Sequence, residues 1–414
     1  MPDKKIVILA YDAISPLGTD LSRQWSRLCL GESGVGPLTR FALTDDFPTR
    51  IAGQIPEESL PNYPFLSPRH QAAWFSPIFR YGMLTAVRAL ENSGLLIDQN
   101  VGPRVAVTYS SAIGGLDALL QADRQLVRGK LPHPYANPNS CINMIGGKIA
   151  IETGATGPIF APISACATGL SSIVTAAMLI MAGRADAAIC GAVDCPLVEP
   201  ICAGFYTMNG CFHEKDGVEC GPEAASRPFA VDRRGFVISE GAGAVIIASD
   251  EFAKAHGLSW RAELRGWSMT SDAHHFVAPH VPTVARCMAE AIADAGLAPA
   301  DIDAINAHAT STKAGDLVEY QALRQVFGVN MPPISANKSQ IGHCMGAASV
   351  VESILALLAL ENALLPPTIN YRPDPEIALA DSLVAWPRRL DQRFILKNAF
   401  GFGGCNACAV FARV

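Results

Sequence analysis

Cys166 is the residue whose setting in the sequence most strongly suggests chemistry. It follows a short apolar segment, 157–163, that is typical of a strand, and it precedes an apolar segment, 170–182, that is typical of a helix. A thiol at the amino end of a helix meets the positive end of the helix dipole, which favours the nucleophilic thiolate. The neighbouring side chains are small, so an acyl group could reach the sulfur and the nearby backbone N–H groups. The setting predicts a nucleophile that carries an acyl group.

Cys166 also has a purely structural interpretation. The chain has 12 cysteines, and free cysteine is among the most buried residue types. Their irregular spacing in apolar segments is more typical of reduced thiols than of a disulfide framework. One CxxC pair, Cys405 and Cys408, lies on an expected core strand. We interpret that pair as packing and expect no metal site.

Three further segments carry side chains that core packing does not require. His308 follows a short strand, among small polar residues. Lys338 and His343 lie on a glycine-containing turn before a long apolar helix, and 398–404 is a glycine-rich loop between apolar strands. Taken singly, each has a structural interpretation: a satisfied histidine, a solvated lysine and a tight turn.

Apolar strand-like segments alternate with helix-like segments along the 414 residues. The pattern predicts strands at 105–109, 186–193, 235–249 and 304–307, and helices at 116–127 and 317–327. Near-continuous apolar strands between helices are typical of a parallel sheet covered on both faces, and hence of an α/β fold. We expect two halves, 1–250 and 251–414, with a surface crossing between them around 220–234.

Composition narrows the possible partners. The net charge of −6 argues against nucleic acid as a partner. The most apolar stretch, 350–365, is interrupted by polar and charged residues, so we expect no membrane span. No apolar signal segment follows the first lysines, and we expect a cytoplasmic protein.

Together the four segments resemble the β-ketoacyl-acyl-carrier-protein synthases, condensing enzymes of the thiolase superfamily, and above all the elongating type II synthase. Further motifs of that family stand at 227–229, 232–236, 239–243, 271–273 and 366–370, and the likeness runs from about residue 6 to residue 410. The resemblance implies a thiolase-like fold, in which two similar βαβαβ halves stack in a five-layer αβαβα arrangement. Cys166 would belong to the first half, and His308, Lys338, His343 and the glycine loop 401–404 to the second.

The resemblance implies an acyltransferase that performs a decarboxylative Claisen condensation. Cys166 would hold the acyl chain, and malonyl-acyl-carrier protein would supply the attacking enolate. His308 and His343 would stabilise that enolate as neutral imidazoles. The backbone N–H groups of Cys166 and Phe402 would bind the second oxyanion. No cofactor is implied, because the substrates are attached to the phosphopantetheine of the carrier protein.

The resemblance assigns roles to further residues. Lys338 would position His343, with Glu319 as its buried acidic partner and Asp316 in support. The remaining assignments are Thr310 and Thr312 to the pantetheine arm, Phe400 and Phe402 to gating, Ile113 and Phe205 to the acyl pocket, and Arg69, Arg124, Arg128 and Lys130 to carrier docking.

The sequence departs from the family pattern at two places. Ala309 stands where the family usually has glycine, and a side chain disfavours positive φ. The docking region is poorer in basic residues than in elongating synthases, which favours an alternative: the ketosynthase subunit of a type II polyketide synthase, paired with a chain-length factor. A homodimer is the first expectation and such a heterodimer the second. A scaffold subunit or a thiolase-like enzyme fits less well, because the cysteine and both histidines are present.

Overall fold

The computed structural model describes residues 4–57, 60–213, 221–379 and 381–414. Within these ranges one mixed sheet has the strand order β5-β4-β6-β7-β1-β8-β14-β13-β9-β10. Its strands are β1 (Ile6–Ile14), β4 (Val105–Ser110), β5 (Ile159–Phe160), β6 (Ala187–Asp194), β7 (Gly241–Ser249), β8 (Ala262–Ser271), β9 (Ala304–Asn306), β10 (Ile334–Ser335), β13 (Phe394–Gly401) and β14 (Cys405–Arg413). Two small antiparallel pairs lie apart from it: β2 (Val35–Pro37) with β3 (Ile51–Gly53), and β11 (Leu364–Leu365) with β12 (Arg388–Arg389).

The sheet consists of the same five-stranded unit used twice. In the first unit β4 lies parallel to β5 and β6, and β7 runs antiparallel to β6 and β1. In the second, β9 lies parallel to β10 and β13, and β14 runs antiparallel to β13 and β8. The units join edge to edge through the antiparallel pair β1 and β8. The expected duplicated α/β architecture is therefore present.

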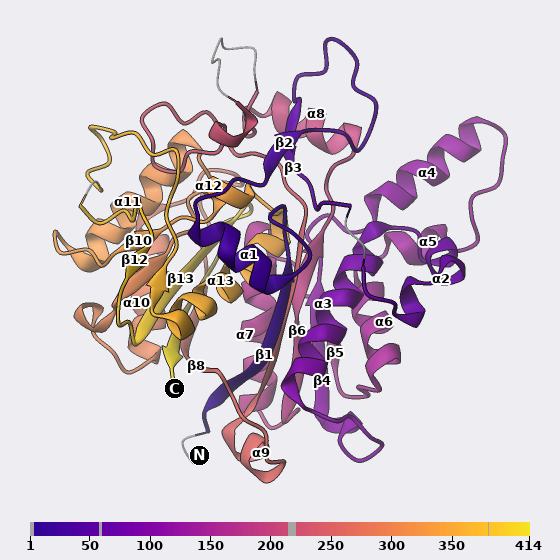
Figure 1. Ribbon diagram of the computed structural model, residues 1–414, viewed down its shortest axis with the longest axis horizontal. Helices are drawn as coiled ribbons and strands as arrows, with labels where there is room; N and C mark the ends of the chain where they lie inside the picture. The colour runs from indigo at the N-terminus through magenta and orange to yellow at the C-terminus, as the bar shows by residue number, and fades with distance from the viewer. Residues whose placement is uncertain (1–3, 58–59, 214–220, 380) are drawn as a thin grey trace.

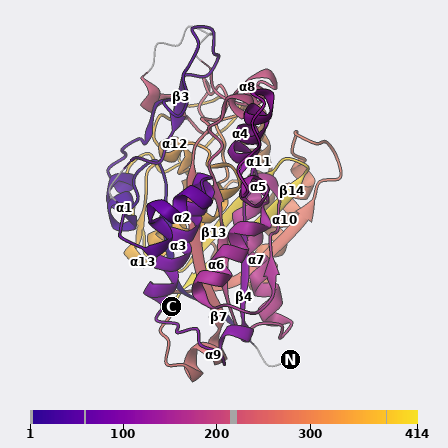
Figure 2. The same cartoon turned by 90° about the vertical axis from the view of Figure 1, so that its right-hand side faces the viewer.

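Helices form the layers on either side of the two units (Figures 1 and 2). The helices are α1 (Leu21–Cys29), α2 (Pro68–Ala73), α3 (Pro77–Ser93), α4 (Leu116–Val127), α5 (Ala136–Ser140), α6 (Asn143–Thr153), α7 (Thr168–Met181), α8 (Glu199–Thr207), α9 (Asp250–Ala255), α10 (Val281–Asp294), α11 (Lys313–Phe327), α12 (Lys338–Ile341) and α13 (Ala348–Asn362). α3 and α6 pack on the first unit, and α10 packs on the second with α11 against it. α7 and α13 pack against each other and against both units, so they form the central layer.

The central helices are apolar because they are enclosed. Nearly every residue of α13 is buried, as expected for a helix that is hydrophobic all round. The stretch Met345–Asn362 is long and apolar enough to cross a membrane by composition, yet 83% of it is buried inside the protein. Its position in the central layer accounts for that composition.

Two expectations about the chain path are wrong. The strand expected at 235–249 begins only at Gly241, because 236–239 forms isolated bridges to Cys211, to His343 and to Gly53 of β3 instead. The expected surface crossing near 220–234 is largely buried where the structure describes it: Arg227 and Arg233 bond inward to neighbouring loops and carboxylates, and Cys220 itself lies outside the described residues. The chain instead passes between the two units at 250–261, through α9.

The start of β1 and the carboxyl end of the chain lie at the end of the molecule opposite β3 and α8 (Figures 1 and 2). The carboxyl ends of the parallel strands face the other way. Segments that follow β5, β9, β10 and β13 therefore meet at one place, which is where Cys166, His308, His343 and Phe402 come together.

Candidate active site

A strained turn places Cys166 between β5 and α7. Cys166 is the middle residue of a single 3-10 turn, Ala165–Ala167, and Ala165 has φ 48°, in the left-handed region. This conformation costs an alanine about 1 kcal/mol or more. The hydroxyl of Thr168 bonds both sides of the turn: it accepts from the Ser164 N–H (3.0 Å) and donates to the Ala165 carbonyl (2.7 Å). The turn is thereby fixed with its sulfur directed into a cavity.

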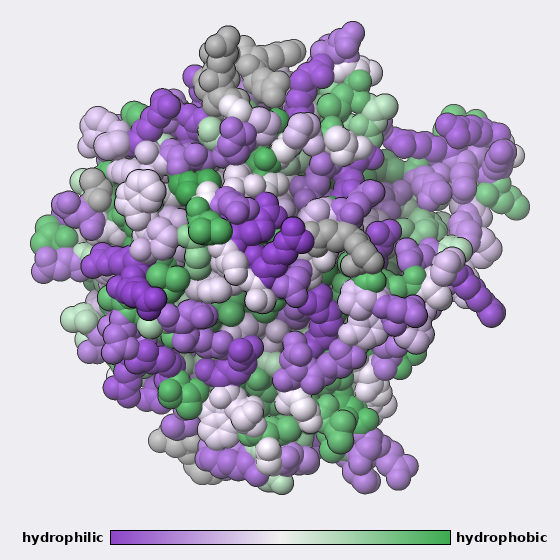
Figure 3. Space-filling model, viewed as in Figure 1, coloured by the Kyte–Doolittle hydropathy of each residue, from purple (hydrophilic) through white to green (hydrophobic). Residues whose placement is uncertain are grey.

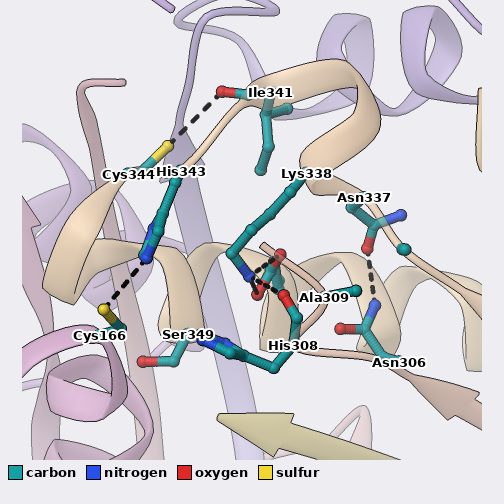
Figure 4. Close-up of polar contacts among 12 residues, drawn as sticks. Cys166, Asn306, His308, Ala309, Asn337, Lys338, Ile341, His343, Cys344 and Ser349 are labelled. Carbon is teal, nitrogen blue, oxygen red and sulfur yellow. Dashed lines mark hydrogen bonds and ion pairs between the residues drawn. The ribbon is translucent and has the colours of Figure 1, made fainter. Parts of the chain in front are cut away.

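His343 lies against the sulfur. Its Nε2 is 3.1 Å from the Cys166 Sγ (Figure 4). The segment expected as the start of a strand holds the His343 backbone: its N–H donates to Val237 (2.7 Å), and its carbonyl accepts from Ser239 (2.9 Å). The Phe236 ring packs edge-on against the imidazole at 5.3 Å. Two distant segments of the sequence thus fix one imidazole.

His308 lies beside His343, just beyond β9. The two ring centroids are 5.8 Å apart, with the planes nearly perpendicular. The N–H groups of His308 and Ala309 both donate to the Glu319 carboxylate, at 2.9 and 2.6 Å. Ala309 has φ 24°, so this alanine adopts the positive φ for which a glycine was expected. The Phe400 ring packs edge-on against His308, at 5.6 Å.

Lys338 is buried behind both imidazoles. Its ammonium donates to the His308 carbonyl (2.6 Å) and to both carboxylate oxygens of Glu352 (2.7 and 2.8 Å). Figure 4 shows this side chain extending toward His308. The expected pairing of Lys338 with Glu319 is wrong, because Glu319 is engaged by backbone N–H groups and by the amide of Asn398. Glu352 was missed, although a glutamate between the apolar residues of a buried helix already signals a buried partner.

Burial sets the protonation states of the three groups. It raises the pKa of the Cys166 thiol to about 11, and Lys338 only partly opposes this. The expected thiolate is therefore not the resting form, because loss of solvation outweighs the helix terminus. Burial, followed by the charge of Lys338, holds the pKa values of His308 and His343 well below the usual range. Both imidazoles are neutral.

The buried Nδ1 atoms indicate the tautomer. Within the described residues, Nδ1 of His308 and Nδ1 of His343 have no hydrogen-bond partner. An unpartnered N–H is costlier to bury than an unpartnered lone pair, so the proton belongs on Nε2. Each imidazole then offers an Nε2–H donor to the cavity.

Two backbone donors face the sulfur. The N–H groups of Cys166 and Phe402 hydrogen-bond toward the Cys166 sulfur and lower its pKa, though less than burial raises it. Gly401 permits this approach: a Cβ there would lie 2.3 Å from the Ser164 carbonyl and 3.1 Å from the Cys166 nitrogen. The glycine is thus required by close packing of two backbones rather than by its own φ.

A cavity of about 800 Å³ is lined by Cys166, His308, His343 and Phe402. Ile113 and Phe205 line it, as do Thr310 and Thr312, whose hydroxyls are 2.9 Å apart. Its wall also includes Phe236, Met345, Val277, Pro279, Phe400 and Phe402. The cavity is mainly apolar, with a few polar groups placed around the sulfur, which is typical of a substrate site.

Asp316 lies beneath the cavity wall rather than in it. Its carboxylate accepts from the N–H groups of Ser311 (3.1 Å) and Phe229 (2.7 Å), both of which have positive φ. Burial raises the pKa of Asp316 to about 7, and the hydrogen bonds and Arg233 only partly offset it. Asp316 thus supports the turn that follows His308.

The four basic residues expected to dock a partner lie on the surface. Arg69 is on α2, and Arg124, Arg128 and Lys130 are on α4 and the turn after it. α4 projects from the body of the protein, and hydrophilic residues gather on it (Figures 1 and 3). Arg124 forms an ion pair with Glu199, which reduces the positive charge available there.

The Cys166, His308 and His343 ligand atoms also lie within 4.8 Å of one another, a donor set that could hold a metal ion. The ammonium of Lys338 behind them opposes a divalent cation. Cys405 and Cys408 lie three residues apart on β14, so their side chains point to opposite faces of the sheet. They cannot chelate one ion together.

Two family models match the chain in succession. The model of the β-ketoacyl synthase N-terminal domain matches residues 3–253, and that of the β-ketoacyl synthase C-terminal domain matches residues 261–372. Two curated relatives named 3-oxoacyl-[acyl-carrier-protein] synthase 2, from Coxiella burnetii and Vibrio harveyi, are each 34% identical over the full length of both chains.

Solved structures of ketosynthases are also similar to this chain. The ishigamide ketosynthase/chain length factor is similar with a TM-score of 0.88 and 30% identity, covering 99% of each chain. A beta-ketoacyl synthase from Burkholderia phymatum has a TM-score of 0.91 and 28% identity, covering 99% of this chain and 100% of the other. A ketosynthase in complex with its chain length factor, from Xenorhabdus doucetiae, has a TM-score of 0.81 and 25% identity, covering 100% and 99%.

Proposed function

Because the chain belongs to the β-ketoacyl synthase family, we propose that it condenses an acyl group held on Cys166 with a malonyl group on an acyl carrier protein. The observation that carries the proposal is the contact of 3.1 Å between the Cys166 Sγ and the His343 Nε2, with His308 and the Lys338–Glu352 pair directly behind. In this proposal residues 1–250 supply the nucleophile, and residues 251–414 supply the two imidazoles that donate to the enolate.

The first step transfers the acyl group. The Cys166 sulfur attacks the carrier thioester while the His343 Nε2–H donates to that sulfur. As the S–C bond to the carrier breaks, the thiol proton passes from Cys166 to the departing carrier sulfur. The high thiol pKa means that deprotonation and attack occur together rather than from a standing thiolate. The products are acyl-Cys166 and the free carrier thiol.

The second step releases carbon dioxide. The bond between the malonyl α-carbon and its carboxylate breaks, and the electron pair becomes an enolate on the thioester. The Nε2–H groups of His308 and His343 donate to the enolate oxygen. Two neutral donors suit this step, because preorganised hydrogen bonds stabilise developing charge in a dry cavity. Lys338 keeps the pKa of both imidazoles low and bonds the His308 carbonyl.

The third step forms the carbon–carbon bond. The enolate carbon attacks the acyl-Cys166 carbonyl, and the N–H groups of Cys166 and Phe402 bind the resulting oxyanion. Collapse of this intermediate breaks the C–S bond, and Cys166 departs as a thiolate that takes one proton from solvent water; this proton balances the negative charge that the malonyl carboxylate brought into the site. The product is a β-ketoacyl group on the carrier protein. No cofactor takes part in this scheme.

Different parts of the cavity wall would contact the phosphopantetheine arm and the acyl chain. Thr310 and Thr312 are proposed to bind the amides of the phosphopantetheine arm, and Ile113 and Phe205 to line the acyl chain. Phe402, supported by Phe400, would gate the acyl side. At the surface, the carrier protein would dock on Arg69, Arg128 and Lys130, with Arg124 contributing less because of its pairing with Glu199. Such a reaction on carrier-bound substrates is proposed to occur in the cytoplasm.

A dimer is proposed around β5. This strand is the edge of the first unit, and Ile159, Phe160 and Ile163 are each about half exposed there. An apolar, unpaired strand edge favours pairing with another chain. A second copy is the first candidate. A chain-length-factor subunit is the second, favoured by the sparse basic patch and by the names of two structural neighbours.

The test is a condensation assay read by intact mass. The protein is incubated with acyl-carrier proteins of several chain lengths and then with malonyl-carrier protein. We expect an acyl adduct on the protein, followed by β-ketoacyl-carrier protein. The adduct should vanish in Cys166→Ala and persist in the matched control Cys141→Ala, since Cys141 is an exposed free thiol. An adduct that survives Cys166→Ala would refute the proposal.

A further inference from the structure

Lys397 is a second fully buried lysine beside the candidate active site, and the proposed reaction leaves it without a role. It lies on β13 and is 0% exposed. Its ammonium donates to the Glu352 Oε2 (2.9 Å) and to the Asn398 carbonyl (2.7 Å). A buried ammonium ion is costly to desolvate, so an uncharged residue would be easier to accommodate at this position.

The two lysines share one carboxylate oxygen. Lys338 donates to both oxygens of Glu352, at 2.7 and 2.8 Å, and Lys397 donates to the same Oε2. These three residues come from α12, β13 and α13, so Glu352 joins three segments. β13 continues directly into Gly401 and Phe402, and Lys338 bonds the His308 carbonyl. Lys338, Glu352 and Lys397 therefore link the turn after β9 to β13, which leads directly into the backbone donor Phe402.

The opposite face of β13 leads to the second buried carboxylate. Successive side chains on a strand point to opposite faces. Lys397 faces Glu352 on α13, whereas the amide of Asn398 donates to Glu319 on α11 (3.1 Å). Glu319 in turn accepts from the N–H groups of His308 and Ala309. Both carboxylates that surround the His308 turn are thus bonded to adjacent residues of β13.

The charges of this cluster balance only with Lys397 included. Two ammonium ions and the two carboxylates of Glu352 and Glu319 sum to zero. Without Lys397 the cluster beside the imidazoles would carry one net negative charge, which favours imidazolium. The positive charges of both lysines lower the pKa of His308 and of His343. Among the described residues, the other titratable group that faces these imidazoles is the Cys166 thiol, 3.1 Å from the His343 Nε2, whereas the Cys344 thiol is directed at the Ile341 carbonyl.

We propose that Lys397 is a positioning residue for the decarboxylation step: it completes the charge balance around Glu352, and thereby keeps Lys338 on the His308 carbonyl and both imidazoles neutral. Lys397 lies outside the cavity wall and touches no substrate. The inference rests on the proposed condensing function. The inference gives a role to the Lys397 ammonium, which the three proposed reaction steps do not use.

The test separates decarboxylation from acyl loading. Malonyl-carrier protein is converted to acetyl-carrier protein by wild type and by Lys397→Met across a range of pH, and acyl loading of Cys166 is followed in parallel. We expect Lys397→Met to lose on the order of 10- to 100-fold in decarboxylation, as for a small displacement of positioned groups. The loss should be greater at acidic pH, because the imidazoles gain protons more readily, and acyl loading should be largely retained.

Three further variants make the result decisive. Lys397→Gln removes the charge but keeps hydrogen-bonding capacity, and it replaces Lys397→Met if that protein does not fold. Lys397→Arg keeps the charge and should keep the wild-type pH profile. The matched control is Lys148→Met, since Lys148 is a buried lysine on α6 that packs over the Trp74 ring, away from the cavity. It should leave both half-reactions and the pH profile unchanged.

Two outcomes would overturn the inference. One is a folded Lys397→Met or Lys397→Gln with the wild-type rate and pH profile. The other is an equal loss of decarboxylation and loading at every pH, which would indicate a structural role only. Failure of the wild-type protein to decarboxylate or load would instead contradict the proposed function, so the two failures are distinguishable.

Discussion

The two five-stranded units carry equivalent turns that differ in chemistry. The turn Ala165–Ala167 leads from β5 into α7, and the turn Met345–Ala347 leads into α13 after β10 and α12. Both are single 3-10 turns that open on a residue with positive φ, 48° at Ala165 and 46° at Met345. Cys166 and Gly346 occupy the same place in the two turns. The cysteine proposed as the nucleophile stands in one unit where the other has no side chain.

The difference extends to the anion site that each turn forms. The Gly346 N–H donates to the Asp194 carboxylate (2.7 Å), which comes from the end of β6. The Cys166 N–H instead faces its own sulfur with the N–H of Phe402, which follows β13, the strand equivalent to β6. A carboxylate of the protein therefore occupies the turn at Gly346, whereas the turn at Cys166 faces the cavity, where the proposed reaction would place the substrate oxyanion.

Of the substitutions considered, Gly401→Ala should have the largest effect, a loss of condensation rate. The new Cβ would lie 2.3 Å from the Ser164 carbonyl, so the loop must withdraw and take the Phe402 N–H away from the sulfur. Loss of one such donor costs on the order of 100- to 1,000-fold in rate. Condensation kinetics would measure this loss. Gly147→Ala is the control, because a Cβ there meets nothing within 4 Å; equal activity of the two variants would contradict the account.

Gly346→Ala should destabilise the protein, because the Asp194 carboxylate already occupies the space beside this turn. Its Cβ would lie 2.7 Å from the Asp194 carboxylate and 2.8 Å from the Ala112 Cβ. Overpacking of this kind costs about 1–3 kcal/mol in the free energy of unfolding. Denaturant unfolding would measure it. A variant as stable as wild type would show that the second turn is not a closed structural site.

The protonation of Cys166 predicts a pH dependence. Its thiol pKa is raised to about 11 by burial, so the thiolate fraction grows throughout the neutral and mildly alkaline range. Alkylation by iodoacetamide, followed by mass spectrometry at Cys166, should therefore accelerate with pH without reaching a plateau near neutrality. A plateau in that range would indicate a standing thiolate and would restore the expectation from the helix terminus.

Ala309→Gly should have the smallest effect. The alanine holds φ 24°, which glycine adopts without a side-chain clash. Relief of that strain should raise the free energy of unfolding by less than about 1 kcal/mol, since glycine also gains entropy in the unfolded chain. Thermal unfolding would measure the change. A destabilised variant would show that the alanine methyl packs productively.

The sequence predicted the elements well where periodicity alone decides them. The helix expected at 116–127 coincides with α4, and the strand expected at 105–109 differs from β4 by one residue. The prediction failed at 235–240, where an apolar segment forms isolated bridges outside the main sheet and holds the His343 backbone. Apolar residues at a strand-like period do not reveal which partner will accept their hydrogen bonds.

The candidate site was predictable in its residue types and not in its electrostatics. Motifs indicated Cys166, His308, Lys338 and His343, which the structure places together. The predicted partner of Lys338 and the predicted thiolate form of Cys166 were wrong, because both depend on burial and on contacts between residues far apart in the sequence. Glu352 and Lys397 lie on separate elements, and only packing of α13 against β13 shows that they meet.

The central claim is that the first unit holds the acyl chain while the second handles the enolate. Decarboxylation of malonyl-carrier protein by Cys166→Gln, compared with Cys166→Gln combined with His308→Ala, tests it most directly. The account predicts that Cys166→Gln still releases carbon dioxide, and that removing His308 reduces the rate on the order of 100-fold or more. A folded Cys166→Gln protein without decarboxylase activity, or a double variant that retains all of it, would contradict the claim.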